Sequence, residues 1–153
     1  MKISMWNIYA RLKYDNIVAM IRDGSETIET ARWIVSSFLN EKTVYVGEAS
    51  VFFYRSNEGT VVVHRNDLLL IPNSDSEEVF NEVCSILEQF REWEKTLNAL
   101  LESENALTKM LDCSDSIFGN PILVYAPDGK SLATSSHYPP EINWHWAEIL
   151  KNN

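Results

Sequence analysis

A polar break between two short apolar runs holds the residue types best suited to binding chemistry. The break reads His64-Arg65-Asn66-Asp67. In an α/β sheet, polar groups at strand ends often face a crevice where ligands bind. His64 and Asp67 suit a small anion or polar ligand, or proton transfer if their pKa values are shifted, and Asn66 adds an amide. The sequence favours a structural turn here, and ligand contact is the alternative.

Arg32, which precedes Trp33, is a second candidate for ligand contact. An arginine beside an aromatic ring can clamp a carboxylate, although an exposed arginine next to a half-buried tryptophan is the commoner arrangement. The complete set of candidate ligand-binding residues is His64, Asn66, Asp67 and Arg32.

No pattern in the chain pairs a nucleophile with a base. The sequence lacks a nucleophile elbow, a Walker loop, GxGxxG and CxxC, and its glycines are isolated. His137 and His145 flank Pro139-Pro140 without a cysteine or carboxylate at ligand spacing, which is a poor zinc pattern. Trp144 and Trp146 favour a core or an interface over an aromatic cage. We therefore predict a non-enzymatic protein with no metal and no cofactor.

The overall charge limits the kinds of partner. A formal net charge of -9 and a pI near 4.8 argue against a nucleic-acid surface, because affinity for phosphate backbones needs clustered Lys and Arg. No stretch approaches the roughly 20 apolar residues of a membrane span, and the N-terminus lacks the apolar run of a signal peptide. Cys84 and Cys113 are interpreted as free thiols, with a disulfide between them as the less favoured alternative. A cytoplasmic location is expected.

The residues from Ser74 to Leu101 predict one long amphipathic helix. Ser74 and Glu77 have the spacing of a capping box. Apolar residues then recur at alternating spacings of four and three, which keeps one stripe on one side of a helix. The stripe packs on the domain's own core, or part of it pairs with a second copy in a homodimer. In the second case the interface residues are Val83, Ile86, Phe90, Trp93, Leu97 and Leu100.

The segment before this helix predicts a small mixed or parallel sheet covered by helices. Strands are expected at 28–34, 43–46, 60–63 and 68–71, with a strand or a helical turn at 17–22. The segment 28–34 also fits a helix, and Gly47 is expected to end the strand at 43–46. The runs at 60–63 and 68–71 are typical of strands buried on both faces. The spacing also predicts a short helix within 3–14, for which Ser4 is a candidate cap.

After the long helix, a further helix at 106–111 and a β-hairpin are predicted. Pro127-Asp128-Gly129-Lys130 is a strong turn signal between strands at 121–125 and 131–135. A last helix is expected after Pro140. The fold class is α/β, divided into an N-terminal domain at 1–73, a connecting and dimerisation helix at 74–111, and a hairpin and helix at 112–153.

Several strings resemble the N-terminal region of bacterial regulators of the PucR type. They are TVYVGEA, VVVHRNDLLLI, EEVFNEV, FREWEKTL and LDCSDSIFGNPILVYAPDGKSLATSS. In that group an α/β sensory region leads through a helix to a PAS- or GAF-like module and then to a helix-turn-helix. The resemblance implies that Asp115 to Ala133 opens such a module, and that the chain senses a small-molecule effector.

The chain departs from that family in its length. A complete module of this kind needs on the order of 100 residues, and far fewer follow Asp115. We therefore expect a fragment of a longer regulator. Two hypotheses follow: the ligand-sensing and dimerisation region of a transcriptional regulator, or a stand-alone α/β protein-interaction module without a ligand.

Overall fold

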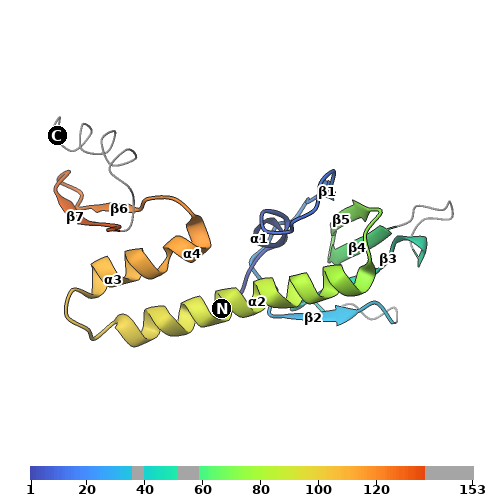
Figure 1. The fold of residues 1–153 in the computed structure, drawn as a ribbon, viewed down its shortest axis with the longest axis horizontal. Helices are drawn as coiled ribbons and strands as arrows, with labels where there is room; N and C mark the ends of the chain where they lie inside the picture. The colour runs from blue at the N-terminus through green and yellow to red at the C-terminus, as the bar shows by residue number, and fades with distance from the viewer. Residues whose placement is uncertain (36–39, 52–58, 137–153) are drawn as a thin grey trace. The chain divides into compact units, whose positions relative to one another are not determined.

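The computed structural model describes residues 1–35, 40–51 and 59–136, which form two compact units. The first unit is Met1–Phe90, and the second begins at Arg91. Figure 1 shows the elements in chain order and colour. The fold is mixed α/β, as the sequence predicted. The predicted domain boundaries at residues 73 and 111 do not coincide with this division, because the long helix contributes to both units.

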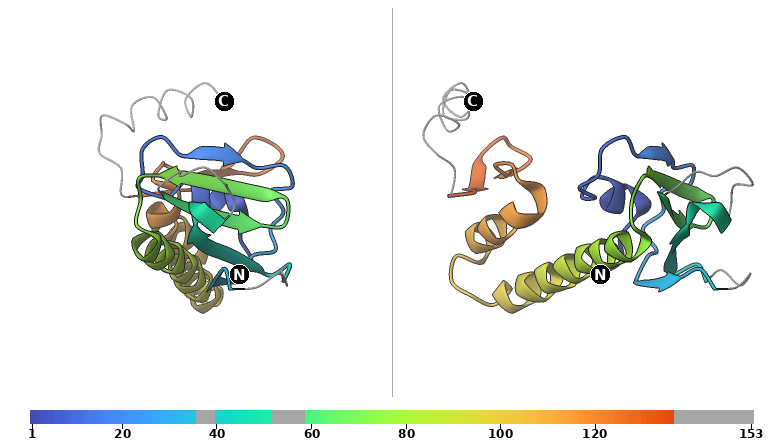
Figure 2. Two further views of the ribbon diagram at one scale, coloured as in Figure 1. Left: turned by 90° about the vertical axis from the view of Figure 1, so that its right-hand side faces the viewer. Right: turned by 45° about the vertical axis from the view of Figure 1, so that its right-hand side comes forward.

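The first unit is built on a five-stranded mixed sheet in the order β1-β5-β4-β3-β2. The strands are β1 (Val18–Met20), β2 (Thr30–Trp33), β3 (Thr43–Glu48), β4 (Gly59–His64) and β5 (Asp67–Pro72). β2 runs parallel to β3, and the other neighbours are antiparallel. Figure 2 shows β1, β5 and β4 side by side.

The two central apolar runs form a tight hairpin. β4 is buried along both faces from Thr60 to His64, as its uninterrupted run of apolar and β-branched residues predicted. β5 instead alternates, because Leu69 and Ile71 are buried whereas Leu68 and Leu70 are only half-buried. The prediction of burial on both faces is therefore wrong for β5, which lies beside the short, exposed edge strand β1.

Gly47 lies inside β3 and does not end it. A Cβ atom at this position would lie 3.0 Å from Cδ1 of Ile34, which follows the neighbouring strand β2. A side chain would therefore have to displace Ile34. Glycine is present here because another side chain covers its backbone closely. After β3 the chain enters the 3-10 helix η1 (Ala49–Val51).

The helix α2 (Ser76–Leu100) covers one face of this sheet with its first half. Thr60 Oγ1 of β4 lies 3.0 Å from Ser76 Oγ, and the ring of Trp33 on β2 stacks on Phe80 with centroids 4.5 Å apart. The short helix α1 (Met5–Tyr9) begins after Ser4, as predicted. Arg11, just beyond α1, lies over the ring of Phe90 at 4.5 Å.

The start of α2 differs from the predicted capping box. The Asp75 carboxylate accepts hydrogen bonds from the backbone N–H groups of Glu77 and Glu78, at 2.8 and 3.0 Å. Ser74 instead donates its hydroxyl to the carbonyl of Ile71 at 2.8 Å. The N-cap is therefore Asp75, because Ser74 is used to close the turn between β5 and the helix.

The second unit contains α3 (Ala106–Cys113), α4 (Asp115–Phe118) and a hairpin of β6 (Leu123–Tyr125) and β7 (Ser131–Thr134). The predicted turn is present: Gly129 has φ +83°, and Ala126 N–H donates to the Lys130 carbonyl at 2.8 Å. Ser136 donates two hydrogen bonds to Asp112, which ties the end of the hairpin to α3. The expected helix after Pro140 lies outside the described residues.

Candidate functional site

The tip of the β4–β5 hairpin brings two of the predicted site residues together. His64 and Asp67 are directly paired across the strands, and both are fully buried. Arg65 and Asn66 form the two-residue loop between them, with Arg65 at φ +54°. The polar break in the sequence is therefore a hairpin turn whose flanking residues point their side chains into the protein.

The Asp67 carboxylate accepts three hydrogen bonds from consecutive backbone N–H groups. Arg22 and Asp23 donate to Oδ1 at 2.7 Å each, and Gly24 donates to Oδ2 at 2.8 Å. Charge-assisted hydrogen bonds to a carboxylate are stronger than neutral ones. Asp67 thus holds the loop after β1 against the hairpin tip, and both of its oxygen atoms are occupied.

The His64 ring joins a third and a fourth segment to the same tip. Nε2 lies 2.9 Å from the carbonyl oxygen of Glu41 and 3.2 Å from Oγ1 of Thr27. A carbonyl oxygen only accepts, so in the neutral ring Nε2 carries the hydrogen. Nδ1 is then an acceptor, and it is buried without a hydrogen-bond partner in the part of the chain that the structure describes.

Arg65 closes the outside of this cluster. Its guanidinium contacts Asp23 Oδ2 at 3.3 Å and Glu41 Oε2 at 2.7 Å, so it bridges the same two segments that Asp67 and His64 hold from within. Hydrogen bonds to Asp23 and then Glu41 raise the pKa of Arg65. These contacts attach two loops to the tip of the hairpin. We call the residues that make them the tip cluster: Asp23, Glu41, His64, Arg65 and Asp67.

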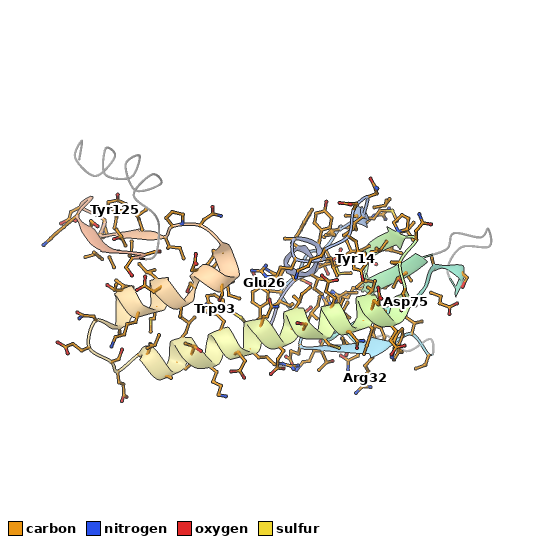
Figure 3. All side chains as sticks on the ribbon, viewed as in Figure 1. Tyr14, Glu26, Arg32, Asp75, Trp93 and Tyr125 are labelled. Carbon is orange, nitrogen blue, oxygen red and sulfur yellow. The ribbon has the colours of Figure 1, made fainter. Side chains whose placement is uncertain are left out.

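The other two predicted ligand residues do not join the tip cluster. Asn66 is exposed in the hairpin loop. Val62 pairs with Val46, which pairs with Trp33, so His64 and Trp33 share one face of the sheet. Arg32 therefore faces the opposite side, and it is exposed on the edge strand β2 (Figure 3). The structure does not bring the four candidate residues into one site.

The helical stripe is divided between the two units. Val83, Ile86 and Phe90 are 0%, 2% and 5% exposed, so one chain already covers them. These three residues belong to the core of the first unit and do not offer surface to a second copy. Leu97 and Leu100 are half-buried. The interpretation of the stripe as the domain's own core therefore describes its first half.

Trp93, the sixth position of the stripe, organises the second unit. Its indole Nε1 donates to Ser114 Oγ at 2.9 Å, and the Ser114 hydroxyl donates in turn to the Met110 carbonyl at 2.6 Å. The Trp93 ring meets Phe118 edge to face, with centroids 5.6 Å apart. The end of α2 is thus joined to α3 and α4 through one aromatic side chain, which Figure 3 labels.

Sequence reasoning missed the roles of Arg65, Asp75 and Ser114. Asp23-Gly24 is a turn signal in the sequence, but nothing local indicates that its backbone N–H groups bind Asp67. Asp75 could have been chosen over Ser74, since Asp is as strong an N-cap as Ser. Arg65 and Ser114 left no local signal, because their partners lie on other elements.

Backbone groups contact the Asp67 carboxylate and His64 Nε2 of the tip cluster. Among residues 1–35, 40–51 and 59–136, no three His, Cys, Asp or Glu side chains are placed to hold a metal ion. In that same part of the chain, no helix combines the length and apolarity needed to cross a membrane. His137, His145 and the tail tryptophans lie outside it.

No protein-family model matches the chain, and no match is found among curated proteins or solved structures.

Proposed function

We propose that this chain is the ligand-sensing and dimerisation region of a bacterial transcriptional regulator, non-enzymatic and not itself DNA-binding. Two things support the proposal. The quoted strings resemble PucR-type regulators, and the order of an α/β unit, a long helix and a helix-hairpin unit is the order that the resemblance implies. The observation that carries it is α2, an uninterrupted helix of 25 residues that contributes to both units.

In this proposal α2 transmits a change in the first unit to the second. A ligand shifts a conformational equilibrium only if it binds the two states with different affinity. An effector that alters packing around Phe90 would displace α2, and Trp93 lies on the next turn of the same helix. Small helix shifts of this kind are a common means of switching.

The proposed dimer uses the second half of the stripe. Leu97 and Leu100 are half-buried, and the adjacent Leu101 is 63% exposed. We expect wild-type protein to have twice the 17.6 kDa mass of one chain in light scattering. A Leu97→Glu, Leu100→Glu variant should be a folded monomer, because two carboxylates would lose hydration in an apolar interface.

The matched control places the same two charges on exposed positions of the same turn. An Asn98→Glu, Ala99→Glu variant should remain dimeric. Equal loss of the dimer in both variants would indicate charge repulsion in an acidic protein instead of a specific interface. A monomeric wild type would contradict the dimer and favour the stand-alone interaction module.

The effector is tested separately by thermal unfolding of the wild-type chain against a panel of small polar metabolites. A ligand at 100 times its Kd stabilises the folded state by about 2.7 kcal/mol, which is a shift of several degrees. Asn66→Ala and Arg32→Ala are the informative variants, since both side chains are exposed and their loss should not affect the core. A panel without any stabilising compound would contradict the sensing role.

A further inference from the structure

We propose that residues 22–24 form a carboxylate cradle, that Asp67 is its built-in occupant, and that the cradle binds a free small carboxylate when the Asp67 side chain is removed. The proposal concerns the backbone of the loop after β1 and does not depend on the function proposed above. Its ligand class is a planar anion with two oxygen atoms, such as formate.

The cradle is formed by backbone donors alone. Three successive N–H groups converge on one carboxylate, with donor-acceptor distances between 2.7 and 2.8 Å and with both oxygen atoms in use. Concavities formed by successive backbone N–H groups bind anions in proteins. Gly24, the residue of the third donor, has φ +59°.

The cradle suits an anion because its three donors meet one buried carboxylate. Asp67 is fully buried, so three N–H groups without an acceptor would lose their hydration and gain nothing in return. Gly24 also has no room for a side chain, since a Cβ atom there would lie 2.8 Å from Nε1 of Trp6. The indole therefore covers the loop from outside while Asp67 fills it from within.

The cradle also fixes the end of the edge strand. The pairing of β1 with β5 ends at Met20 with Leu68, and Asp67 is the next residue of β5. Without its anion, the loop from Arg22 to Gly24 loses the three hydrogen bonds that attach it to the hairpin. Removing the carboxylate should thus loosen β1 before it affects the centre of the sheet.

The test is anion rescue of Asp67→Ala, measured by the thermal midpoint in sodium formate and in sodium chloride at equal ionic strength. The alanine variant removes the carboxylate and leaves space for formate. We expect formate to raise its midpoint by several degrees more than chloride does. Wild type and Asp67→Asn should show no difference between the two salts, because their side chains still fill the cradle.

An equal effect of formate and chloride on the folded alanine variant would overturn the proposal. If that variant does not fold, amide hydrogen exchange on the wild type decides. The N–H groups of Arg22, Asp23 and Gly24 should exchange far more slowly than that of the exposed residue Glu26. Exchange of all three at the rate of Glu26 would show that Asp67 does not occupy a cradle.

Discussion

At the scale of single residues, buried polar side chains of this protein form hydrogen bonds between segments that are distant in the sequence. Asp67 holds backbone groups 43 to 45 positions earlier in the chain, and His64 holds Glu41 and Thr27. These side chains satisfy polar groups that burial would otherwise leave without a hydrogen-bond partner. Replacing such a side chain therefore costs more stability than the net contribution of the hydrogen bond itself.

Tyr14 provides a titration that reports on the contact between its loop and α2. Burial, followed by the charges of Glu82, Glu78 and Asp75, raises the pKa of its phenol above 10.0. The folded state thus favours the neutral phenol, and this contribution to stability is present below pH 10 and lost as the pH rises through the folded pKa.

We expect Glu82→Gln to lower the pKa of Tyr14 toward its ordinary value, because among the three carboxylates Glu82 contributes most to the shift, after burial. The measurement is the ultraviolet absorbance of tyrosinate, with the Tyr14→Phe titration subtracted. Glu77→Gln changes an exposed carboxylate of the same helix that is not among the causes of the shift. An equal response to both substitutions would show that only net charge matters.

Ser114→Ala should destabilise the second unit. Ser114 is 5% exposed, and its loss leaves the Trp93 indole N–H without this acceptor and the Met110 carbonyl without this donor. We expect a cost of about 1 to 2 kcal/mol, measured by urea unfolding followed by tryptophan fluorescence. Ser116→Ala changes an exposed serine two residues away and should cost far less; similar losses for both would contradict the role of this hydrogen bond.

At the scale of elements, α2 combines a local start signal with a long-range packing pattern. Asp75 satisfies two of the N–H groups that a helix leaves unpaired at its beginning, and Glu77 and Glu78 follow in the first turn. Its buried side chains Val79, Val83, Ile86, Leu87 and Phe90 then fix which side faces the sheet.

Asp75→Ala should lower the free energy of unfolding by about 1 kcal/mol, the usual cost of losing an N-cap. Urea unfolding followed by circular dichroism measures this change. Asp75→Asn is the matched control, because an asparagine amide oxygen caps nearly as well without the charge. If the asparagine variant loses as much as the alanine variant, attraction between the charge and the helix dipole is the cause instead of the hydrogen bonds.

At the scale of the whole molecule, the chain carries an excess of negative charge. Its formal net charge is -9, with 22 acidic and 13 basic residues. Among the described ion pairs, Arg65 is held by Asp23 and Glu41, and Lys2 and Lys42 both contact Glu29. Part of the basic side chains is thus neutralised by neighbouring carboxylates.

We therefore expect no binding to duplex DNA at physiological salt. The measurement is fluorescence anisotropy of a labelled duplex titrated with the wild-type chain. Non-specific DNA binders have Kd values of roughly 10⁻⁴ to 10⁻⁶ M under these conditions. A Kd in that range would contradict the proposal that this chain does not itself bind DNA.

The sequence by itself determined the elements whose signals are local. The spacing of apolar residues gave the long helix, Pro127-Asp128-Gly129-Lys130 gave the second hairpin, and the apolar runs gave the strands of an α/β fold. These predictions succeeded because periodicity and turn preference act between residues a few positions apart.

Only the tertiary structure decided the strand order, the face of Arg32 and the division of the helical stripe. Val83 and Leu97 have the same place in the repeat, but one is fully buried in the first unit and the other is half-buried in the second. The partners of Asp67 are equally beyond local reach, since they lie in a loop that only the pairing of β1 with β5 brings near. Spacing specifies which residues share a face, whereas packing of distant segments decides what that face meets.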